Sequence, residues 1–234
     1  TRARLLADTG READTLALEL GDLGSVRRAA EEWLARGQPL HVLIDNAGLA
    51  GTPGLTPSGF ELAFGTNHVG TFLFTTLLVP RLRESAPSRV VVVASRAHYD
   101  APGIDWDAIR RRTSSLTGMP EYRVSKLANV LFAAELGRRL EGSGVATASL
   151  HPGVVATDVW RRVPWPASAL MKLAMISPED GARTSLHCAT SPEIPLATGA
   201  YWSSERQKQA SAVARDASLA AELYRRSEEW TAGA

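Results

Sequence analysis

Short runs of apolar residues alternate with longer stretches of helical periodicity along this chain. Residues 16–20, 40–44, 89–94 and 145–150 are short and rich in aliphatic or β-branched side chains, which is typical of strands. Residues 199–202 form a shorter fifth candidate. Because these runs are almost continuously apolar, we expect both faces of the strands to be buried, as in a parallel sheet covered by helices.

Helical patterns occupy the intervals between these runs. Apolar residues recur at helical spacing, and glycines such as Gly37 and Gly142 mark where helices end. The alternation predicts an α/β fold, a Rossmann-like doubly wound parallel sheet in a single domain over residues 1–234. The predicted helices cover residues 25–36, about 66–84, 121–141, 178–189 and a last stretch through Leu219, Leu223 and Trp230.

Composition adds limits on partners and compartment. Hydrophobic residues make up 44%, charged residues 22%, and the net charge is +1, so nothing favours nucleic acid or an anionic membrane as a partner. The single cysteine, Cys188, allows no intrachain disulfide, which suits a reducing compartment and predicts a cytoplasmic protein. No apolar run approaches the ~20 residues of a membrane span, and no metal-binding residues are predicted.

Tyr122 and Lys126 form the first candidate site. They stand four positions apart in a predicted helix, so their side chains share one face. A free tyrosine, with a pKa near ~10, is a poor acid or base at neutral pH, and a neighbouring ammonium group lowers that pKa. The pair is therefore a candidate general acid/base. The same spacing arises by chance in many helices, so the pair alone is a weak signal.

Other candidates follow the ends of strands. Ser95 closes the valine-rich strand, where it can hydrogen-bond a substrate carbonyl or simply cap the next turn. Asn46, Ala47 and Gly48 follow the strand before it, and their small size lets a flat ring or a backbone approach closely.

Two further candidate features complete the series along the chain. Asn67 opens the long helix, where an N-cap is the plain alternative to a functional role. Pro152 and Gly153 follow the fourth strand, and a Pro-Gly turn is also a common way to end one. Each feature is weak by itself, but chance does not explain all five in this order at these places.

In this arrangement the chain resembles the short-chain dehydrogenase/reductase superfamily over essentially its whole length. It is most similar to the retinol dehydrogenase-like branch, which also includes the WW-domain-containing oxidoreductases. The interval of 27 positions from Ser95 to Tyr122 is longer than is usual in the superfamily and matches an insertion of this branch. The resemblance rests on four short sequence motifs, at residues 66–70 (TNHVG), 95–98 (SRAH), 125–132 (SKLANVLF) and 151–155 (HPGVV).

The resemblance implies a role for each candidate. Tyr122 would be the general acid/base, Lys126 would lower its pKa and bind the nicotinamide ribose, and Ser95 would orient the substrate oxygen. Asn67 would hold a water in a proton relay through Lys126. The cofactor-binding residues that the resemblance implies are Asp22, Asn46, Ala47, Gly48, Tyr122, Lys126, Pro152, Gly153, Val155 and Thr157.

Two departures from the family pattern stand out. Asp45 occupies a position where the family usually has Asn, and we expect this change to be tolerated. The family begins with a strand, a Thr-Gly-x-x-x-Gly-x-Gly turn and a helix, and this sequence contains no such glycine cluster. Residues 1–9 resemble the end of the family's second helix. We therefore expect a chain that lacks the first βαβ portion and binds NAD(H) or NADP(H) poorly.

This reading has a geometric consequence. The family's sheet order, 3-2-1-4-5-6-7, would place two absent strands between residues 16–20 and residues 40–44. At ~4.8 Å per strand these two segments would lie roughly 14 Å apart. A packed domain cannot leave such a gap empty, so we expect either a fragment of a longer chain or a degenerate gene product.

Together these inferences predict an NAD(P)-dependent oxidoreductase that interconverts a lipophilic alcohol and its aldehyde or ketone. The resemblance favours NADP, with NAD as the alternative cofactor. A non-catalytic binding or scaffold protein on the same fold is the competing hypothesis. Apolar residues after Thr157 could form a lid over the site or pack as an ordinary surface helix: Trp160, Val163, Trp165, Leu170, Met171, Leu173, Met175 and Ile176.

The helices that start near residues 67 and 121 also carry apolar outer faces. In the family this pair of helices commonly builds a dimer interface, so we expect a homodimer. The apolar residues on which this expectation rests are Phe72, Leu73, Leu77, Leu131 and Phe132.

Overall fold

A computed structural model describes residues 2–153, 177–194 and 199–233. Val155 and Thr157, which were predicted to contact the cofactor, lie outside these ranges. So does the whole apolar stretch from Trp160 to Ile176 that was predicted as a lid.

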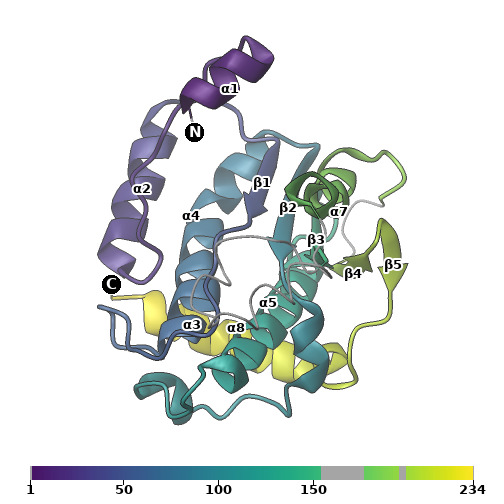
Figure 1. Ribbon diagram of the computed structural model, residues 1–234. Coiled ribbons are helices and arrows are strands. Elements are labelled where there is room, and N and C mark those ends of the chain that lie inside the picture. Colours follow the sequence, from purple (N-terminus) through teal and green to yellow (C-terminus); the bar gives the residue numbers. More distant parts are fainter. Residues whose placement is uncertain (1, 154–176, 195–198, 234) are drawn as a thin grey trace.

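A five-stranded sheet forms the centre of the described part of the chain (Figure 1). The first four strands are parallel, and the last pairs with its neighbour in the antiparallel sense. The doubly wound α/β prediction is confirmed, although the last strand was not predicted. In order across the sheet the strands are β1 (Val42–Asp45), β2 (Ser88–Val93), β3 (Val145–His151), β4 (Ala200–Ser203) and β5 (Arg206–Lys208).

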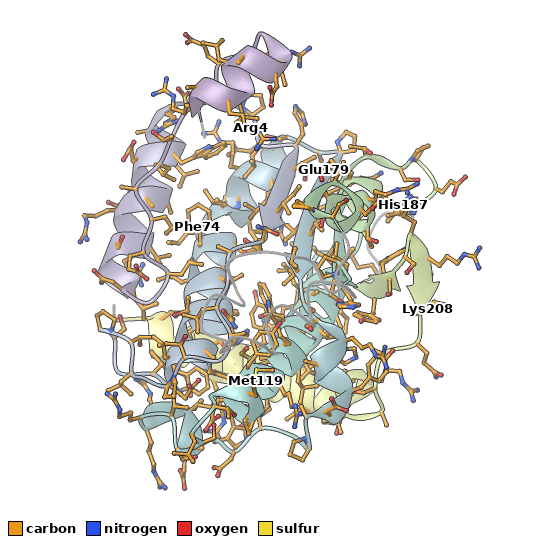
Figure 2. All side chains as sticks on the ribbon, in the orientation of Figure 1. Arg4, Phe74, Met119, Glu179, His187 and Lys208 are labelled. Carbon is orange, nitrogen blue, oxygen red and sulfur yellow. The ribbon has the colours of Figure 1, made fainter. Side chains whose placement is uncertain are left out.

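Residues 16–20 form no strand, so that prediction is wrong. They belong to an irregular, mostly exposed segment between α1 (Arg2–Thr9) and α2 (Leu23–Ala35). A strand persists only where its backbone groups pair with a neighbour, and this segment does not pair with β1. Helix α1, which was expected from the sequence, has no buried residue and lies beyond the end of α2, with side chains such as Arg4 (Figures 1 and 2).

Strand β1 lies at the edge of the sheet and is more exposed than the inner strands. Val42 and Ile44 are each 38% exposed, whereas β2 and β3 are almost entirely buried. The family's sheet order would place two strands beside β1 that the sequence was expected to lack, and no strand of the described ranges pairs with that edge.

Helices cover both faces of the sheet, as the apolar character of its strands predicted. Successive residues of β2 point to opposite sides. Val90 and Val92 pack with α4 (Thr71–Glu84) and α5 (Met119–Arg139) on one face. Val91 and Val93 pack with α7 (Pro178–Thr190) on the other. Short 3-10 turns within the described ranges lie outside the sheet, at η2 (Arg96–Asp100), η3 (Ala108–Arg110) and η5 (Val213–Arg215).

The long helix before β2 begins earlier than predicted. It runs through α3 (Leu62–Phe64), a π-helical turn η1 (Gly65–Gly70) and α4 without a break. The Glu61 carboxylate caps its start by accepting a hydrogen bond from the Phe64 N–H at 2.8 Å. Asn67 therefore lies inside the helix, and its interpretation as an N-cap is wrong. The helix Leu62–Glu84 is long and apolar enough to cross a membrane. However, 67% of its most apolar 18-residue stretch is buried within the protein, as in a core helix.

Helix α8 (Ala217–Thr231) lies across the outer faces of α4 and α5 (Figure 1). Its Tyr224 ring contacts Phe72 edge-on, with ring centroids 4.9 Å apart, and also lies near Phe132. Its Leu223 shares a buried cluster with Leu73 and Leu131. Most of the side chains that suggested a dimer interface are therefore buried by a helix of the same chain, which removes the basis for that expectation.

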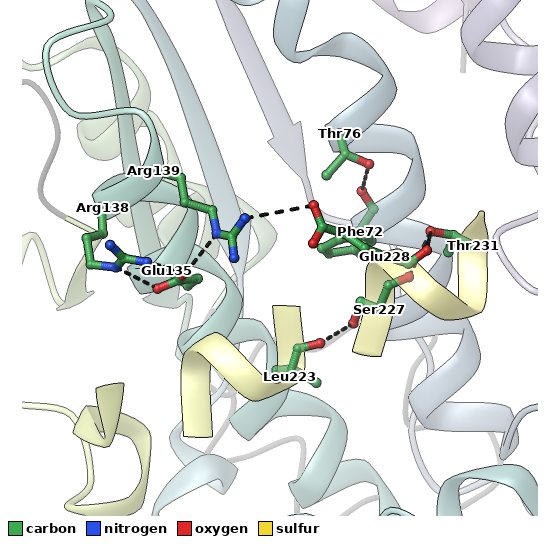
Figure 3. Close-up of polar contacts among 9 residues, drawn as sticks. All are labelled: Phe72, Thr76, Glu135, Arg138, Arg139, Leu223, Ser227, Glu228 and Thr231. Carbon is green, nitrogen blue, oxygen red and sulfur yellow. Dashed lines mark hydrogen bonds and ion pairs between the residues drawn. The ribbon is translucent and has the colours of Figure 1, made fainter. Parts of the chain in front are cut away.

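Polar contacts hold α8 in this position (Figure 3). The Glu135 carboxylate of α5, only 2% exposed, accepts hydrogen bonds from Arg138 and from Arg139 at 2.6–2.8 Å. Arg139 in turn lies 3.8 Å from Glu228 of α8 and stacks on the Tyr224 ring. The buried charge of Glu135 is thus neutralised at the junction between the two helices.

Candidate active site

The carboxyl ends of β1, β2 and β3 open onto a cavity of about 900 Å³. Parallel strands bring the residues that follow them to a single edge of the sheet, which is why candidates far apart in sequence meet there. The predicted site residues that line the cavity are Asn46, Ala47, Gly48, Ser95, Tyr122, Lys126, Pro152 and Gly153.

Lys126 reaches this cavity from α5 and is buried along most of its length. It is 5% exposed, and its Nζ donates a hydrogen bond to the Val93 carbonyl at 2.8 Å. Burial lowers the pKa of Lys126 to about 8, because the interior disfavours the ammonium form. An ammonium has three N–H donors, and the Val93 bond uses one, so two remain for a ligand.

Tyr122 lies one helical turn before Lys126, whose Nζ is 5.8 Å from the centre of the tyrosine ring. Burial raises the pKa of Tyr122, and a hydrogen bond with the Ser95 side chain offsets part of that rise. The sequence argument expected the lysine to lower this pKa, and the structure gives the opposite direction because desolvation dominates. Tyr122 is therefore a neutral phenol at neutral pH, the form that donates a proton.

Ser95 stands between β2 and η2 in extended conformation. Its Oγ accepts a hydrogen bond from the Ala97 N–H at 3.2 Å, so the capping role considered from the sequence is real. A hydroxyl that accepts one bond keeps its own hydrogen to donate. Ser95 thus caps the turn η2 with its Oγ and can donate its hydroxyl hydrogen into the cavity.

Asn67 lies one layer behind the cavity and is 1% exposed. Its Oδ1 accepts from the Leu49 N–H at 2.8 Å, and its Nδ2 donates to the Leu49 carbonyl and to Ser125 Oγ, both at 2.9 Å. Asn67 therefore ties the turn after β1 to α5. A water-mediated relay through this residue stays a prediction.

Gly48 is held at the centre of this arrangement. A Cβ added there would lie 2.9 Å from Asn67 Oδ1 and 3.5 Å from Lys126 Nζ, so both polar atoms face the same spot. A side chain at this position would collide with Asn67 Oδ1, so glycine lets the turn after β1 pack closely against Asn67, the close backbone approach that the sequence suggested.

Sequence reasoning missed several contributors. Ser125 is fully buried and donates from Oγ to the Tyr122 carbonyl at 2.8 Å, linking Asn67 to the Tyr122 backbone. A serine just before the lysine was visible in the sequence, but nothing marked it as buried. The cavity is also lined by Arg96, Asp100, Met119 and, from the first turns of α7, Pro178, Gly181, Ala182, Ser185 and Leu186. Helix α7 was predicted, but its position over the site was not.

Asp22 is not brought to the cavity. Its side chain caps α2 by accepting from the Gly24 N–H at 3.0 Å and lies 3.8 Å from Arg28. Contact with an adenine ring stays a prediction for this residue.

A nicotinamide nucleotide fits this cavity at one end. The lining offers a small residue at Gly48, the two remaining Lys126 donors, and the Tyr122 and Ser95 hydroxyls, which suit a ring and its ribose. For a pyrophosphate, the lining formed by the described residues offers no glycine-rich turn leading from a strand into a helix. The fit therefore extends to the nicotinamide and its ribose.

Comparison with known families and structures agrees with this geometry. Residues 1–106 match the family model described as short chain dehydrogenase. An uncharacterized protein from Mycobacterium paratuberculosis is 33% identical, with a TM-score of 0.73 over 99% of this chain and 81% of that one. The NADPH-bound carbonyl reductase from chicken fatty liver, at 20% identity and a TM-score of 0.64, shares the fold over 89% of this chain and 81% of its own. The chain belongs to the short-chain dehydrogenase family.

The curated proteins similar to this chain include several retinol dehydrogenases. Human retinol dehydrogenase 11 is 41% identical over 214 residues, which cover 88% of this chain and 65% of the relative. Human retinol dehydrogenase 14 is 40% identical over 88% of this chain and 63% of its own length. The chain thus spans slightly less than two thirds of these relatives.

Proposed function

We propose that the protein carrying this chain is an NAD(P)-dependent oxidoreductase that interconverts a lipophilic alcohol and its aldehyde or ketone. The observation that carries the proposal is the meeting of Ser95, Tyr122 and Lys126 in one cavity at the end of the sheet. Family membership supports the class of reaction.

The protein's own residues would position the substrate oxygen and donate the proton to it. Ser95 donates a hydrogen bond from Oγ to the carbonyl oxygen and so holds it beside the Tyr122 hydroxyl. Tyr122 then gives its proton to that oxygen as the carbonyl carbon accepts a hydride, and the product is the alcohol. Burial keeps the Tyr122 phenol protonated at neutral pH but also weakens it as an acid, so the transfer relies on the Lys126 ammonium beside it.

Lys126 would act at the cofactor end of the cavity. When bound, the nicotinamide supplies or accepts the hydride. The two free Nζ donors of Lys126 would hold the ribose hydroxyls, and the ammonium charge would stabilise the Tyr122 phenolate that remains after proton transfer. Asn67 keeps the turn of residues 46–48 in place beside this end.

The lining supports a lipophilic substrate. Apolar side chains that line the cavity include Ile44, Met119 and Leu186, which come from β1, α5 and α7. The relatives named retinol dehydrogenases point to long apolar alcohols. The resemblance favours NADP over NAD, and rates measured with NADPH and NADH would decide. For the compartment we propose the cytoplasm, because the one cysteine is buried and free, and cell fractionation would test this.

The test is a single-atom deletion at the proposed acid. In the full-length protein that contains these 234 residues, reduction of a long-chain aldehyde by NADPH is followed at 340 nm. Tyr122→Phe should lower turnover at least ~100-fold, the usual scale for a general acid. Tyr224→Phe is a matched control, because it removes a tyrosine hydroxyl from α8, outside the cavity lining, and keeps the ring that packs on Phe72.

Two results would contradict the proposal. Turnover in Tyr122→Phe that equals the wild type would remove the acid/base role. If the wild type binds cofactor and substrate but shows no turnover, the binding-protein alternative is favoured. Tyr122→Phe and the wild type would then be equally inactive.

A further inference from the structure

His98 lies directly behind Ser95 and is completely buried. It belongs to the short turn η2, and its ring Nδ1 lies 2.7 Å from the Ser95 carbonyl oxygen. Its backbone N–H donates to the same carbonyl at 3.1 Å. On the other side of the ring, the Ser211 N–H points at Nε2 from 3.2 Å. One imidazole therefore bridges Ser95 and the segment that leads into α8.

These contacts fix the tautomer of the ring. A backbone amide can only donate, so Nε2 must accept from Ser211 and carries no hydrogen. The hydrogen of the neutral ring then lies on Nδ1 and is donated to the Ser95 carbonyl. Burial lowers the pKa of His98, which keeps the ring in this neutral form, although the Ser95 bond and Asp100 act the other way.

Two aromatic rings stop the imidazole from turning. Its centroid is 4.1 Å from the Tyr99 ring and 4.7 Å from the Tyr201 ring. Tyr99 is itself anchored, since its hydroxyl donates to the Gln209 carbonyl at 2.6 Å. The Ser95 carbonyl thus accepts its hydrogen bonds from a rigid group rather than from a mobile side chain.

We propose that His98 is a positioning residue that sets the Ser95 hydroxyl for its contact with Tyr122 and the substrate oxygen. With the carbonyl of Ser95 held by the ring and the backbone of His98, the peptide plane is fixed, and with it the direction of the Cα–Cβ bond. The Ser95 Oγ is then aimed at the cavity instead of rotating with the turn. This inference deepens the proposed oxidoreductase function and rests on it.

Three substitutions separate the two bonds of the ring. His98→Asn places an amide N–H where Nδ1 was and keeps the bond to Ser95, but it cannot reach Ser211. His98→Gln places its carbonyl oxygen where Nε2 was and keeps the Ser211 bond, but it loses the donor to Ser95. His98→Phe fills the space and loses both. Tyr224→Phe is the control, because it removes a hydroxyl from α8, where the ring packs on Phe72 and Phe132 and not on His98.

The first measurement is carbonyl reduction in the full-length protein, with melting temperatures recorded for every variant. We expect kcat to fall at least tenfold in His98→Phe and His98→Gln with KM little changed, and to return to within about threefold of the wild type in His98→Asn. If activity follows melting temperature across the three variants, or if Asn and Gln recover equally, the ring acts only in stability and the positioning role is wrong.

The second measurement does not depend on enzyme activity. Because the Ser95 hydrogen bond lowers the Tyr122 pKa, a displaced Ser95 should raise it. Carbon-13 NMR of Cζ-labelled tyrosine in the 234-residue chain would report the Tyr122 pKa, with Tyr122→Phe to assign the signal. We expect a higher pKa in His98→Gln and His98→Phe and no change in His98→Asn. An unchanged pKa in all three would overturn the inference, whereas a wild type without reductase activity but with these pKa shifts would overturn only the proposed function.

Discussion

Lowering the pH from 7 to 5 should destabilise the fold through His68, a buried histidine remote from the cavity. His68 lies in η1, among the rings of Phe64, Phe72 and Phe132. Its Nε2 is 2.9 Å from Ser227 Oγ, and the Ser227 hydroxyl donates to the Leu223 carbonyl, so Nε2 must carry the hydrogen. Nδ1 is then an unprotonated nitrogen without a hydrogen-bond partner.

Protonation of Nδ1 would place both a charge and an unpaired N–H in this core. Burial accordingly lowers the pKa of His68 from 6.5 to about 3. Between these values the unfolded chain binds a proton that the folded chain does not, so the stability that His68 allows at pH 7 is lost progressively below pH 6.5. At about 1.4 kcal/mol per pH unit, the loss at pH 5 is about 2 kcal/mol.

Wild-type stability alone does not isolate this effect. Asp45 has a pKa raised by burial to about 7, so its contribution falls as pH rises and runs against that of His68. The measurement is therefore a difference in the free energy of unfolding between the wild type and His68→Gln, obtained by urea denaturation at pH 7 and at pH 5. Glutamine keeps a donor for Ser227 and does not titrate.

The wild type should lose about 2 kcal/mol relative to His68→Gln between the two pH values. Ser227→Ala is the control: it removes the hydrogen bond at both pH values but leaves the titrating ring, so its pH dependence should match the wild type. Parallel pH profiles for the wild type and His68→Gln would refute the reasoning, because the ring would then take up its proton without cost.

Three other predictions follow from the same structure. Asp45→Asn should raise the free energy of unfolding at pH 8 by about 1–2 kcal/mol, measured by urea denaturation, and should not change it at pH 4. The half-buried carboxylate destabilises the fold only when it is ionised, so equal stabilisation at both pH values would contradict this. Gly70→Ala should destabilise by about 1–3 kcal/mol in thermal unfolding, since the new Cβ would overlap the Leu20 backbone carbonyl, whereas Gly233→Ala, which meets nothing within 4 Å, should be neutral. The 234-residue chain should bind NADPH with a dissociation constant of about 1 mM or weaker by calorimetry, because the described cavity leaves phosphate charges unpaired; a low micromolar value would show that the phosphates have another site.

The parts of the fold that could be predicted are those that local pattern determines. Strands β2 and β3 lie within one residue of their predicted bounds. In β2 an unbroken run of valines suits a strand that is buried on both faces. Tyr122 and Lys126 meet because helix geometry alone puts positions i and i+4 on one face. The order of strand ends then carried Ser95 and Gly48 to the same cavity.

What could not be predicted depends on residues distant in sequence. Residues 16–20 have the pattern of a strand, but pairing requires a neighbour, and the sequence does not show where that neighbour lies. The apolar face of α4 was recognised, yet its pattern could not say that Tyr224 covers it rather than a second copy of the chain. The direction of the Tyr122 pKa was missed for the same reason, since desolvation is a property of the assembled site.

The placement of α8 has a consequence for how the protein is made. Residues 217–231 supply Tyr224 to the buried cluster that contains Phe72, although residue 217 is made some 145 positions after Phe72. Until residues 217–231 leave the ribosome, the side chains of Phe72, Leu73 and Phe132 are exposed. Chaperones that recognise apolar segments would bind this surface first. A message that stops before residue 217 would therefore yield a chain with its proposed catalytic residues present but its outer helical layer bare, and cellular quality control rather than loss of chemistry would decide its fate.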